Sequence, residues 1–233
     1  MVMPLAGRAA AAAAGGLLVL VAVSSVTVTL IVSRPVNSRL TRWVDRMVDW
    51  AYDQAAWRFA DYRRRDQIRA TQAAAVLLAQ LAAWLFVAYM GFALLLWPFA
   101  TRGVASAFVD AGSSLFTLGY TEPPGSWPAA LVFFAAATGL VIVALQIGYL
   151  PTLYAAFNRR ETEVALLNAR SGVPSWGPEL LSRTHYALGS GTSTVDTLPD
   201  LYDRWERWAA DVAESHTTYL PLVRFRSPRP LSS

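Results

Sequence analysis

A short run, Thr117-Leu118-Gly119-Tyr120-Thr121, has the clearest potential for chemistry in this chain. It lies between two long apolar segments and directly follows a stretch too short to cross a bilayer. Extended backbone is tolerated at membrane depth only where protein buries it or where it lines water and ions. The arrangement is typical of an ion-selective pore loop, so it predicts cation conduction.

The composition indicates a membrane protein. Apolar residues make up 55% of the 233 positions, and the mean hydropathy is +0.34. All 20 basic residues are arginine and there is no cysteine, which excludes disulfides and thiolate metal sites. The arginines lie beside apolar spans and not on a basic face with aromatic residues, so nucleic acid is not an expected partner.

Three segments are long enough to cross about 30 Å of hydrocarbon, namely residues 11–32, 73–100 and 128–157. Residues 103–116 give a helix of only about 21 Å, which is too short to span. We therefore predict an all-α integral membrane protein. It has three transmembrane helices, a re-entrant pore helix and filter loop between the second and third, and a small helical cytoplasmic tail.

Arginine counts in the loops predict the orientation, because acidic residues contribute little to this rule. Only Arg8 precedes the first span, whereas nine arginines lie in the connector to the second span and nine in the tail. We expect the connector and the C-terminus in the cytoplasm and the N-terminus outside. The alternative for the first span is a cleaved signal peptide, with Ala22-Val23-Ser24 as its cleavage site. Cleavage would translocate the nine-arginine connector, which favours a retained span.

Residues 34–72 form an amphipathic connector rich in Arg and Trp, in which residues 38–70 are predicted as one long helix. Trp43, Trp50 and Trp57 recur every seven positions. The apolar residues expected on the same side are Leu40, Val44, Met47, Val48 and Ala51. One interpretation places this helix among lipid headgroups, with Trp as anchor and Arg facing anionic lipid. The other is a cytoplasmic helix packed on its neighbours in an oligomer.

The tail, residues 158–233, continues the third helix until Gly172-Val173-Pro174 interrupts it. Two shorter helices are expected near residues 178–188 and 199–217. The tail has no Gly-x-Gly-x-x-Gly turn after a strand and no phosphate-binding loop. His185 and His216 have no metal-ligand spacing around them, so no cofactor or resident metal is expected. The spans hold no nucleophile with a base, so an enzyme is not expected.

The run at residues 117–121 resembles the Thr-Val-Gly-Tyr-Gly filter of the potassium channel family, with Leu118 for Val and Thr121 for the last Gly. Residues 128–157, followed by Asn-Arg-Arg-Glu-Thr-Glu, resemble the inner helix and its cytoplasmic exit in prokaryotic two-span channels. The resemblance covers roughly residues 71–169 and implies a pore module at residues 73–157, after an N-terminal span in residues 1–33. It also implies a homotetramer in the bacterial inner membrane.

The resemblance implies that the carbonyl oxygens of Thr117, Leu118, Gly119 and Tyr120 coordinate permeating K⁺, or Na⁺, with one loop per subunit. Gly119 suits a backbone that takes a positive φ. Tyr120 is expected to direct its hydroxyl toward a partner in the pore helix. That helix ends before the filter, so its partial negative end faces the cation.

Ser113 and Ser114 are available in the pore helix to brace the filter. At the outer end of the run, the β-branched Thr121 would need at least ~1–2 kcal/mol to take a positive φ. We therefore expect another conformation there. A weakly selective channel, or a non-conducting channel-like protein with a regulatory or scaffolding role, is the rival function. Glu122 falls where the family has an acidic residue at the outer mouth, and a ring of carboxylates there attracts cations.

Glycines in the third span suggest where it could bend. Gly139 and Gly148 are candidate hinges of an inner-helix gate. Close helix packing is the alternative, because small residues commonly serve that purpose in lipid.

Overall fold

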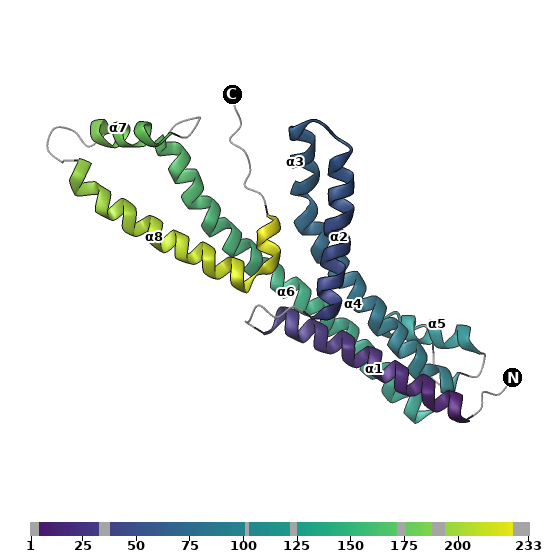
Figure 1. Ribbon diagram of the computed structural model, residues 1–233. Coiled ribbons are helices and arrows are strands. Elements are labelled where there is room, and N and C mark those ends of the chain that lie inside the picture. Colours follow the sequence, from purple (N-terminus) through teal and green to yellow (C-terminus); the bar gives the residue numbers. More distant parts are fainter. Residues whose placement is uncertain are drawn as a thin grey trace. The chain divides into compact units, whose positions relative to one another are not determined.

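The computed structural model describes residues 5–32, 38–100, 103–121, 125–171, 176–187 and 194–225. Its elements are α1 (Leu5–Leu30), α2 (Arg39–Trp57), α3 (Tyr62–Ala70), α4 (Gln72–Leu96), η1 (Trp97–Phe99), α5 (Val104–Leu115), α6 (Ser126–Ser171), α7 (Gly177–Ala187), α8 (Thr194–Thr218) and η2 (Leu220–Arg224) (Figure 1). No strand occurs in these described ranges. The chain divides into two compact units, Met1–Leu150 and Pro151–Ser233, which are described separately.

Three helical stretches are long and apolar enough to cross a membrane: Ala6–Leu30, Arg63–Phe99 and Ser126–Ser171. This confirms the all-helical class and the prediction of three helices long and apolar enough to cross a membrane. The third helix, α6, has 46 residues, which corresponds to about 69 Å, roughly twice the thickness of the hydrocarbon. It therefore continues well beyond one bilayer crossing, and it ends at Ser171, directly before the predicted Gly-Val-Pro interruption.

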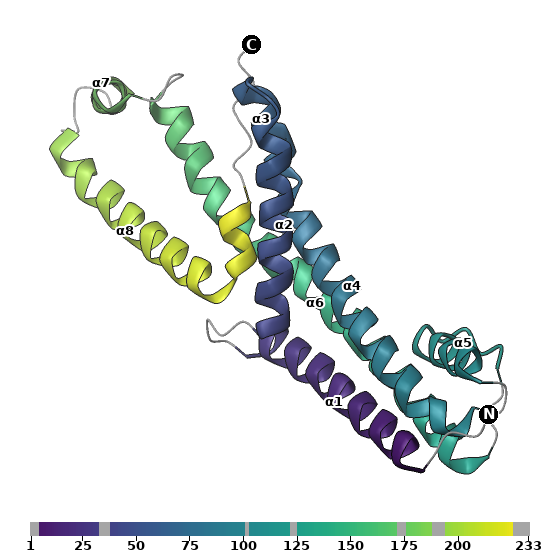
Figure 2. The ribbon, with the colours of Figure 1, turned by 45° about the vertical axis from the view of Figure 1, so that its right-hand side comes forward.

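The core of the first unit joins four helices. Its buried residues are Val19, Ala22 and Val26 of α1, Trp84, Ala88, Phe92, Ala93 and Leu96 of α4, Ala107, Ala111 and Leu115 of α5, and Ala135 and Ile142 of α6. Figures 1 and 2 both show α1 running along α4. The largest of these side chains, Trp84 and Phe92, are fully buried, so α4 forms the centre of the unit.

Two glycines allow α1 and α4 to approach closely. A Cβ built on Gly15 would lie 2.6 Å from the carbonyl oxygen of Gly91, so only glycine fits this crossing. Small residues are the usual means by which helices pack in lipid. Farther along the same pair, Trp84 Nε1 donates a hydrogen bond of 2.9 Å to Ser25 Oγ. The first span is thus packed against the second along most of its length.

The connector differs from the prediction of one long helix over residues 38–70, because it forms two helices, α2 and α3, that lie side by side (Figure 1). α2 ends at Trp57, and Asp61 begins the next helix, its side chain accepting a hydrogen bond of 3.0 Å from the backbone of Arg63. A local side-chain cap of this kind competes with helix continuation.

The expected apolar side of the connector is also different. Val44 is buried, whereas Trp43 is 59% exposed. The residues buried on α2 are Thr41, Val44, Asp45 and Ala56. The tryptophans therefore lie on a different side of the helix from Val44, and Met47 and Ala51 are the expected neighbours that share their exposure. Helical spacing alone does not tell which of two apolar arcs packs inward.

The second unit contains the end of α6 together with α7, α8 and η2. The helices predicted near residues 178–188 and 199–217 are confirmed as α7 and α8, with α8 beginning five residues earlier, at Thr194. Trp208 of α8 donates a hydrogen bond of 3.3 Å to the backbone oxygen of Arg160 on α6. This contact joins the two long helices of the unit.

Candidate functional site

The short helix α5 positions the predicted filter loop. It has 12 residues, close to the predicted 103–116, and begins after Gly103, whose φ of 87° requires glycine. Ala107, Ala111 and Leu115 bury one side of α5 in the core. The ring of Phe108 meets that of Tyr89 of α4 edge to face, with centroids 5.7 Å apart. These contacts fix the end of α5, from which the loop starts.

The first residues of the loop form a C-terminal cap on α5. Thr117 has a φ of 54° and is the only described residue other than glycine with a positive φ. Its backbone N–H donates to the carbonyl oxygen of Ser114 at 2.9 Å, and that of Leu118 donates to the oxygen of Ser113 at 2.7 Å. A left-handed residue followed by these two bonds is a common way for helices to end.

The next two peptides continue the same pattern. The N–H of Gly119 donates to the carbonyl oxygen of Ser113 at 3.3 Å, and the N–H of Tyr120 donates to Ser113 Oγ at 3.1 Å. Gly119 has a φ of 69°. Four consecutive N–H groups, those of residues 117–120, therefore converge on Ser113 and Ser114, and both serines are buried.

This convergence decides where the carbonyl groups point. A trans peptide is planar, and its C=O and N–H lie on opposite sides of the chain. Because the N–H groups of residues 117–120 face the end of α5, the carbonyls of residues 116–119 face away from it. That the oxygens of residues 117–120 coordinate an ion stays a prediction. Residues 116–120 are all exposed in the single chain.

Backbone strain lies at Thr117, a residue of the predicted filter for which the sequence did not predict a positive φ. For a β-branched residue a positive φ costs about 1–2 kcal/mol. The Thr117 hydroxyl donates to the carbonyl oxygen of Phe116 at 2.8 Å. Thr121 does not take a positive φ, as its β-branch predicts. The alternation of positive φ at Thr117 and Gly119 therefore does not extend to Thr121.

The expected role of the Tyr120 side chain differs from the structure. The ring is 63% exposed, and the group that reaches α5 is the backbone N–H, which is bonded to Ser113 Oγ. The expected brace by Ser113 and Ser114 is present, but it works through the main chain of the loop. Glu122 lies outside the described residues.

The third span, α6, packs against the end of α5 next to the loop. A Cβ built on Gly139 of α6 would lie 2.0 Å from the carbonyl oxygen of Leu115, the last residue of α5. This contact matches the close-packing alternative for Gly139. By contrast, a Cβ on Gly148 would meet nothing within 4 Å, so packing does not explain that glycine.

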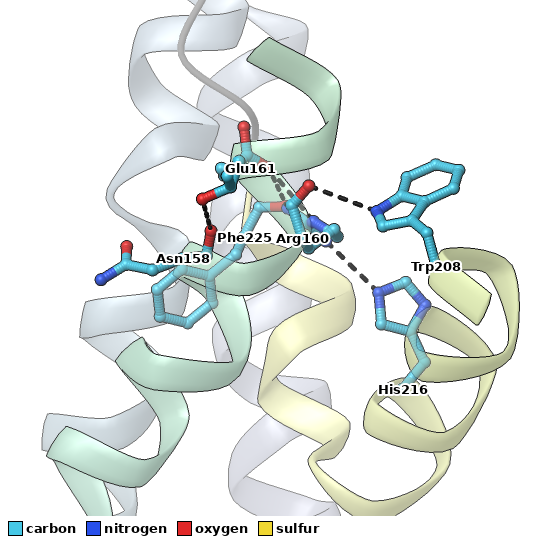
Figure 3. A network of polar contacts seen from close by, with 7 residues as sticks. Asn158, Arg160, Glu161, Trp208, His216 and Phe225 are labelled. Carbon is cyan, nitrogen blue, oxygen red and sulfur yellow. Dashed lines mark hydrogen bonds and ion pairs between the residues drawn. The ribbon is translucent and has the colours of Figure 1, made fainter. Parts of the chain in front are cut away.

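A second polar cluster lies in the second unit, at the continuation of α6 (Figure 3). Arg160 forms hydrogen bonds of 3.1 and 3.0 Å to Glu161 Oε1 and lies 3.3 Å from Nε2 of His216 on α8. A guanidinium has donors only, so His216 must accept through Nε2. Arg160 also stacks on the Phe157 ring at 5.1 Å.

The same cluster contacts Phe225, the residue directly after η2. The Phe225 ring lies 5.1 Å from Phe157 and 5.8 Å from Tyr154, centroid to centroid. Its carbonyl oxygen is 3.5 Å from Arg160 Nη2. We call Arg160, His216 and Phe225 the α6 clasp. The sequence did not predict it, because the residues that meet are 56 and 65 positions apart.

Comparisons with protein-family models, curated proteins and solved structures give no match to this chain. The class of protein therefore follows from the structure alone. It is an all-helical chain with three helices compatible with a multi-pass membrane protein. Among the residues described, no group of three or more His, Asp or Glu side chains could hold a metal ion.

Proposed function

We propose that this chain is the subunit of a homotetrameric cation channel, with potassium as the principal ion and sodium as a secondary one. The ions pass through backbone carbonyls of the loop after α5. The oxygens used are those of residues 116–119, and Tyr120 and Thr121 line the outer end. Glu122 forms the outer mouth.

One observation carries this proposal: the N–H groups of residues 117–120 are all bonded to Ser113 and Ser114. The opposite edges of these peptides, which carry the carbonyl oxygens of residues 116–119, then face away from α5. A dehydrated cation requires such oxygens to replace its water. One loop can surround only part of an ion, so four copies around an axis are needed to complete the coordination. The exposure of residues 116–120 in one chain fits this requirement.

Helix electrostatics favour a cation. The C-terminus of α5 lies next to the loop, and the aligned peptide dipoles give this end a partial negative charge. With four copies, four such ends point toward the axis. The channel has its N-terminus outside and its tail in the cytoplasm, following the arginine counts. The contacts of Gly15 with Gly91 and of Trp84 with Ser25 support α1 as a retained span.

Ion flux through purified protein tests the function. The chain is reconstituted in liposomes, and K⁺ and Na⁺ flux is compared for Gly119→Ala and Gly16→Ala. Alanine at 119 must adopt a φ of 69°, which costs about 1 kcal/mol per chain and about 4 for a tetramer. Gly16 has open space around a Cβ and an ordinary φ, so it is the matched control. We expect Gly119→Ala to abolish flux while tetramers persist, and Gly16→Ala to conduct normally.

A non-conducting, channel-like membrane protein is the second candidate. The hydrogen bonds of Thr117 and Leu118 to α5 are those of an ordinary helix cap, and Thr121 interrupts the filter pattern. Purified tetramers that pass neither K⁺ nor Na⁺ under any voltage would favour this candidate. Normal flux through Gly119→Ala would exclude a carbonyl filter at this loop.

A further inference from the structure

The outer surface of α2 carries three tryptophans in one stripe. Trp43, Trp50 and Trp57 are 59%, 66% and 85% exposed. Residues seven apart on a helix are offset by only about 20° per repeat, so the three rings lie in a row. Met47 beside them is 50% exposed. A row of large exposed apolar side chains marks an interaction site, because soluble surfaces rarely carry one.

The opposite side of α2 already has its partner within the chain. Gln80 of α4 donates to Asp45 at 2.6 Å, and Gln72 donates to Asp49 at 2.8 Å. Val44 is buried on the same side. The packing of α2 on α4 is therefore complete without the tryptophans, and their stripe is available to something outside the chain.

The charged side chains of α2 and of the adjoining start of α3 differ in how they are used. The acidic side chains that are hydrogen bonded to the chain's own groups are Asp45, Asp49, Asp53 and Asp61. Arg39, Arg42 and Arg46, next to the tryptophans, are exposed. The stripe therefore combines aromatic rings with cations, while the neighbouring carboxylates are used internally. Such a surface complements an anionic partner.

The position of α2 identifies the partner as lipid. Ser25 of α1 is 2.5 Å from Ser38, the N-cap of α2, and Thr29 is 3.0 Å from Thr41, oxygen to oxygen. The first turn of α2 is thus bonded to the end of a membrane span. Trp and Arg at this level are the residues that anchor proteins in headgroups. A second copy is a poorer match, because two stripes facing each other would bring together the exposed Arg39, Arg42 and Arg46 of both copies.

We propose that the stripe of Trp43, Trp50 and Trp57 with Arg39, Arg42 and Arg46 docks on the anionic phospholipid surface at the inner end of α1. The tryptophans enter the headgroup layer and the arginines bind lipid phosphates. The proposal does not depend on ion conduction, so a chain that conducts nothing can still satisfy it.

Lipid quenching of a single fluorophore tests the docking. The full chain has no cysteine, so Met47→Cys provides one labelling site in the stripe. The labelled protein is placed in nanodiscs of phosphatidylcholine, with or without phosphatidylglycerol, that contain lipids with a headgroup-level quencher. We expect strong quenching that increases with phosphatidylglycerol and decreases with salt, since salt screens exposed charges.

Two arginine triplets give a matched comparison. Arg39→Gln, Arg42→Gln and Arg46→Gln together remove three charges from the stripe, and Arg63→Gln, Arg64→Gln and Arg65→Gln remove three from α3. We expect the first set to weaken the phosphatidylglycerol-dependent association about fivefold per arginine and the second to leave it unchanged. Equal effects of the two sets would overturn the proposal. Absence of quenching would also overturn it. Energy transfer between labels on two copies, together with protection of the label from the lipid quencher, would overturn it as well, because that result would place a second copy on the stripe.

Discussion

Gly139 of α6 lies directly against the last carbonyl of α5, so close that a Cβ there would be 2.0 Å from the oxygen of Leu115. Leu115 precedes the loop by a single residue. The backbone of the third span thus forms the wall behind the proposed filter. A change in α6 at this level must move α5, and with it Ser113 and Ser114, which hold the loop.

The first prediction concerns this contact. Gly139→Ala forces α5 and α6 apart, because the clash is with backbone that cannot rotate away. We expect a loss of about 1–3 kcal/mol in stability, as for other overpacked sites, together with loss of ion flux. Thermal unfolding in detergent and liposome flux measure the two effects. Gly148→Ala, where the added methyl meets nothing within 4 Å, is the control for unfolding, and an equal melting temperature for both variants would contradict the contact.

The second prediction separates the two serines at the end of α5. Ser113 Oγ accepts from the N–H of Tyr120 at 3.1 Å, whereas Ser114 Oγ donates to Asp110 within the helix at 2.6 Å. Ser113→Ala leaves a loop N–H without its acceptor, at a cost of about 1–3 kcal/mol. We expect it to alter selectivity or reduce flux, and Ser114→Ala to have little effect. Reversal potentials with K⁺ and Na⁺ on opposite sides test this, and the reverse ranking would remove Ser113 from the support of the filter.

The spans, α5 and the tail helices could be predicted from the sequence because they depend on local features. Apolar length defines a span, and Gly103, with its positive φ, precedes α5. The break between α2 and α3 could not be predicted in this way. There, Asp61 accepts a hydrogen bond from the backbone of Arg63 and caps a new helix, α3. The helical spacing of residues in the sequence continues through this segment and does not reveal the break.

The site was predictable in part for a similar reason. Gly119 signalled a positive φ because glycine adopts it freely. Thr117 gave no such signal, since its φ of 54° is imposed by the hydrogen bonds that end α5. Arg160 and His216 meet only through the folded tail. Contacts between distant residues and strain at non-glycine positions therefore required the structure.

The third prediction concerns the outer end of the loop. Thr121 does not take a positive φ, so the alternation of positive φ at Thr117 and Gly119 ends before it. Thr121→Gly removes the steric cost of about 1–2 kcal/mol per chain and allows the pattern to extend by another site. We expect higher selectivity for K⁺ over Na⁺, seen as a shifted reversal potential under bi-ionic conditions. An unchanged reversal potential would show that selectivity is set elsewhere.

The fourth prediction tests how α1 is held. A Cβ on Gly91 would lie 2.8 Å from Val19 Cγ2 and 3.0 Å from the oxygen of Gly15. Gly91→Val should therefore separate α1 from α4 and lower stability by about 1–3 kcal/mol or more. Gly16→Val adds the same atoms on the same helix pair where space is open, and it should be tolerated. Thermal unfolding and protease sensitivity of α1 measure the difference, and equal tolerance would mean that α1 does not cross α4 at these glycines.

The last prediction concerns the α6 clasp. His216 Nε2 accepts from Arg160, which in turn binds Glu161 and the carbonyl of Phe225 (Figure 3). His216→Arg replaces the acceptor by a second cation beside Arg160, so the clasp should lose about 1–3 kcal/mol. His216→Gln keeps an acceptor and should preserve the clasp.

Hydrogen exchange of residues 215–225 reports the difference between the two variants, because release of the clasp exposes the end of α8 and η2. Since α6 is continuous from Gly139 to Arg160, altered flux in His216→Arg but not in His216→Gln would link the tail to the pore. Equal protection in both variants would show that Arg160 does not depend on this acceptor.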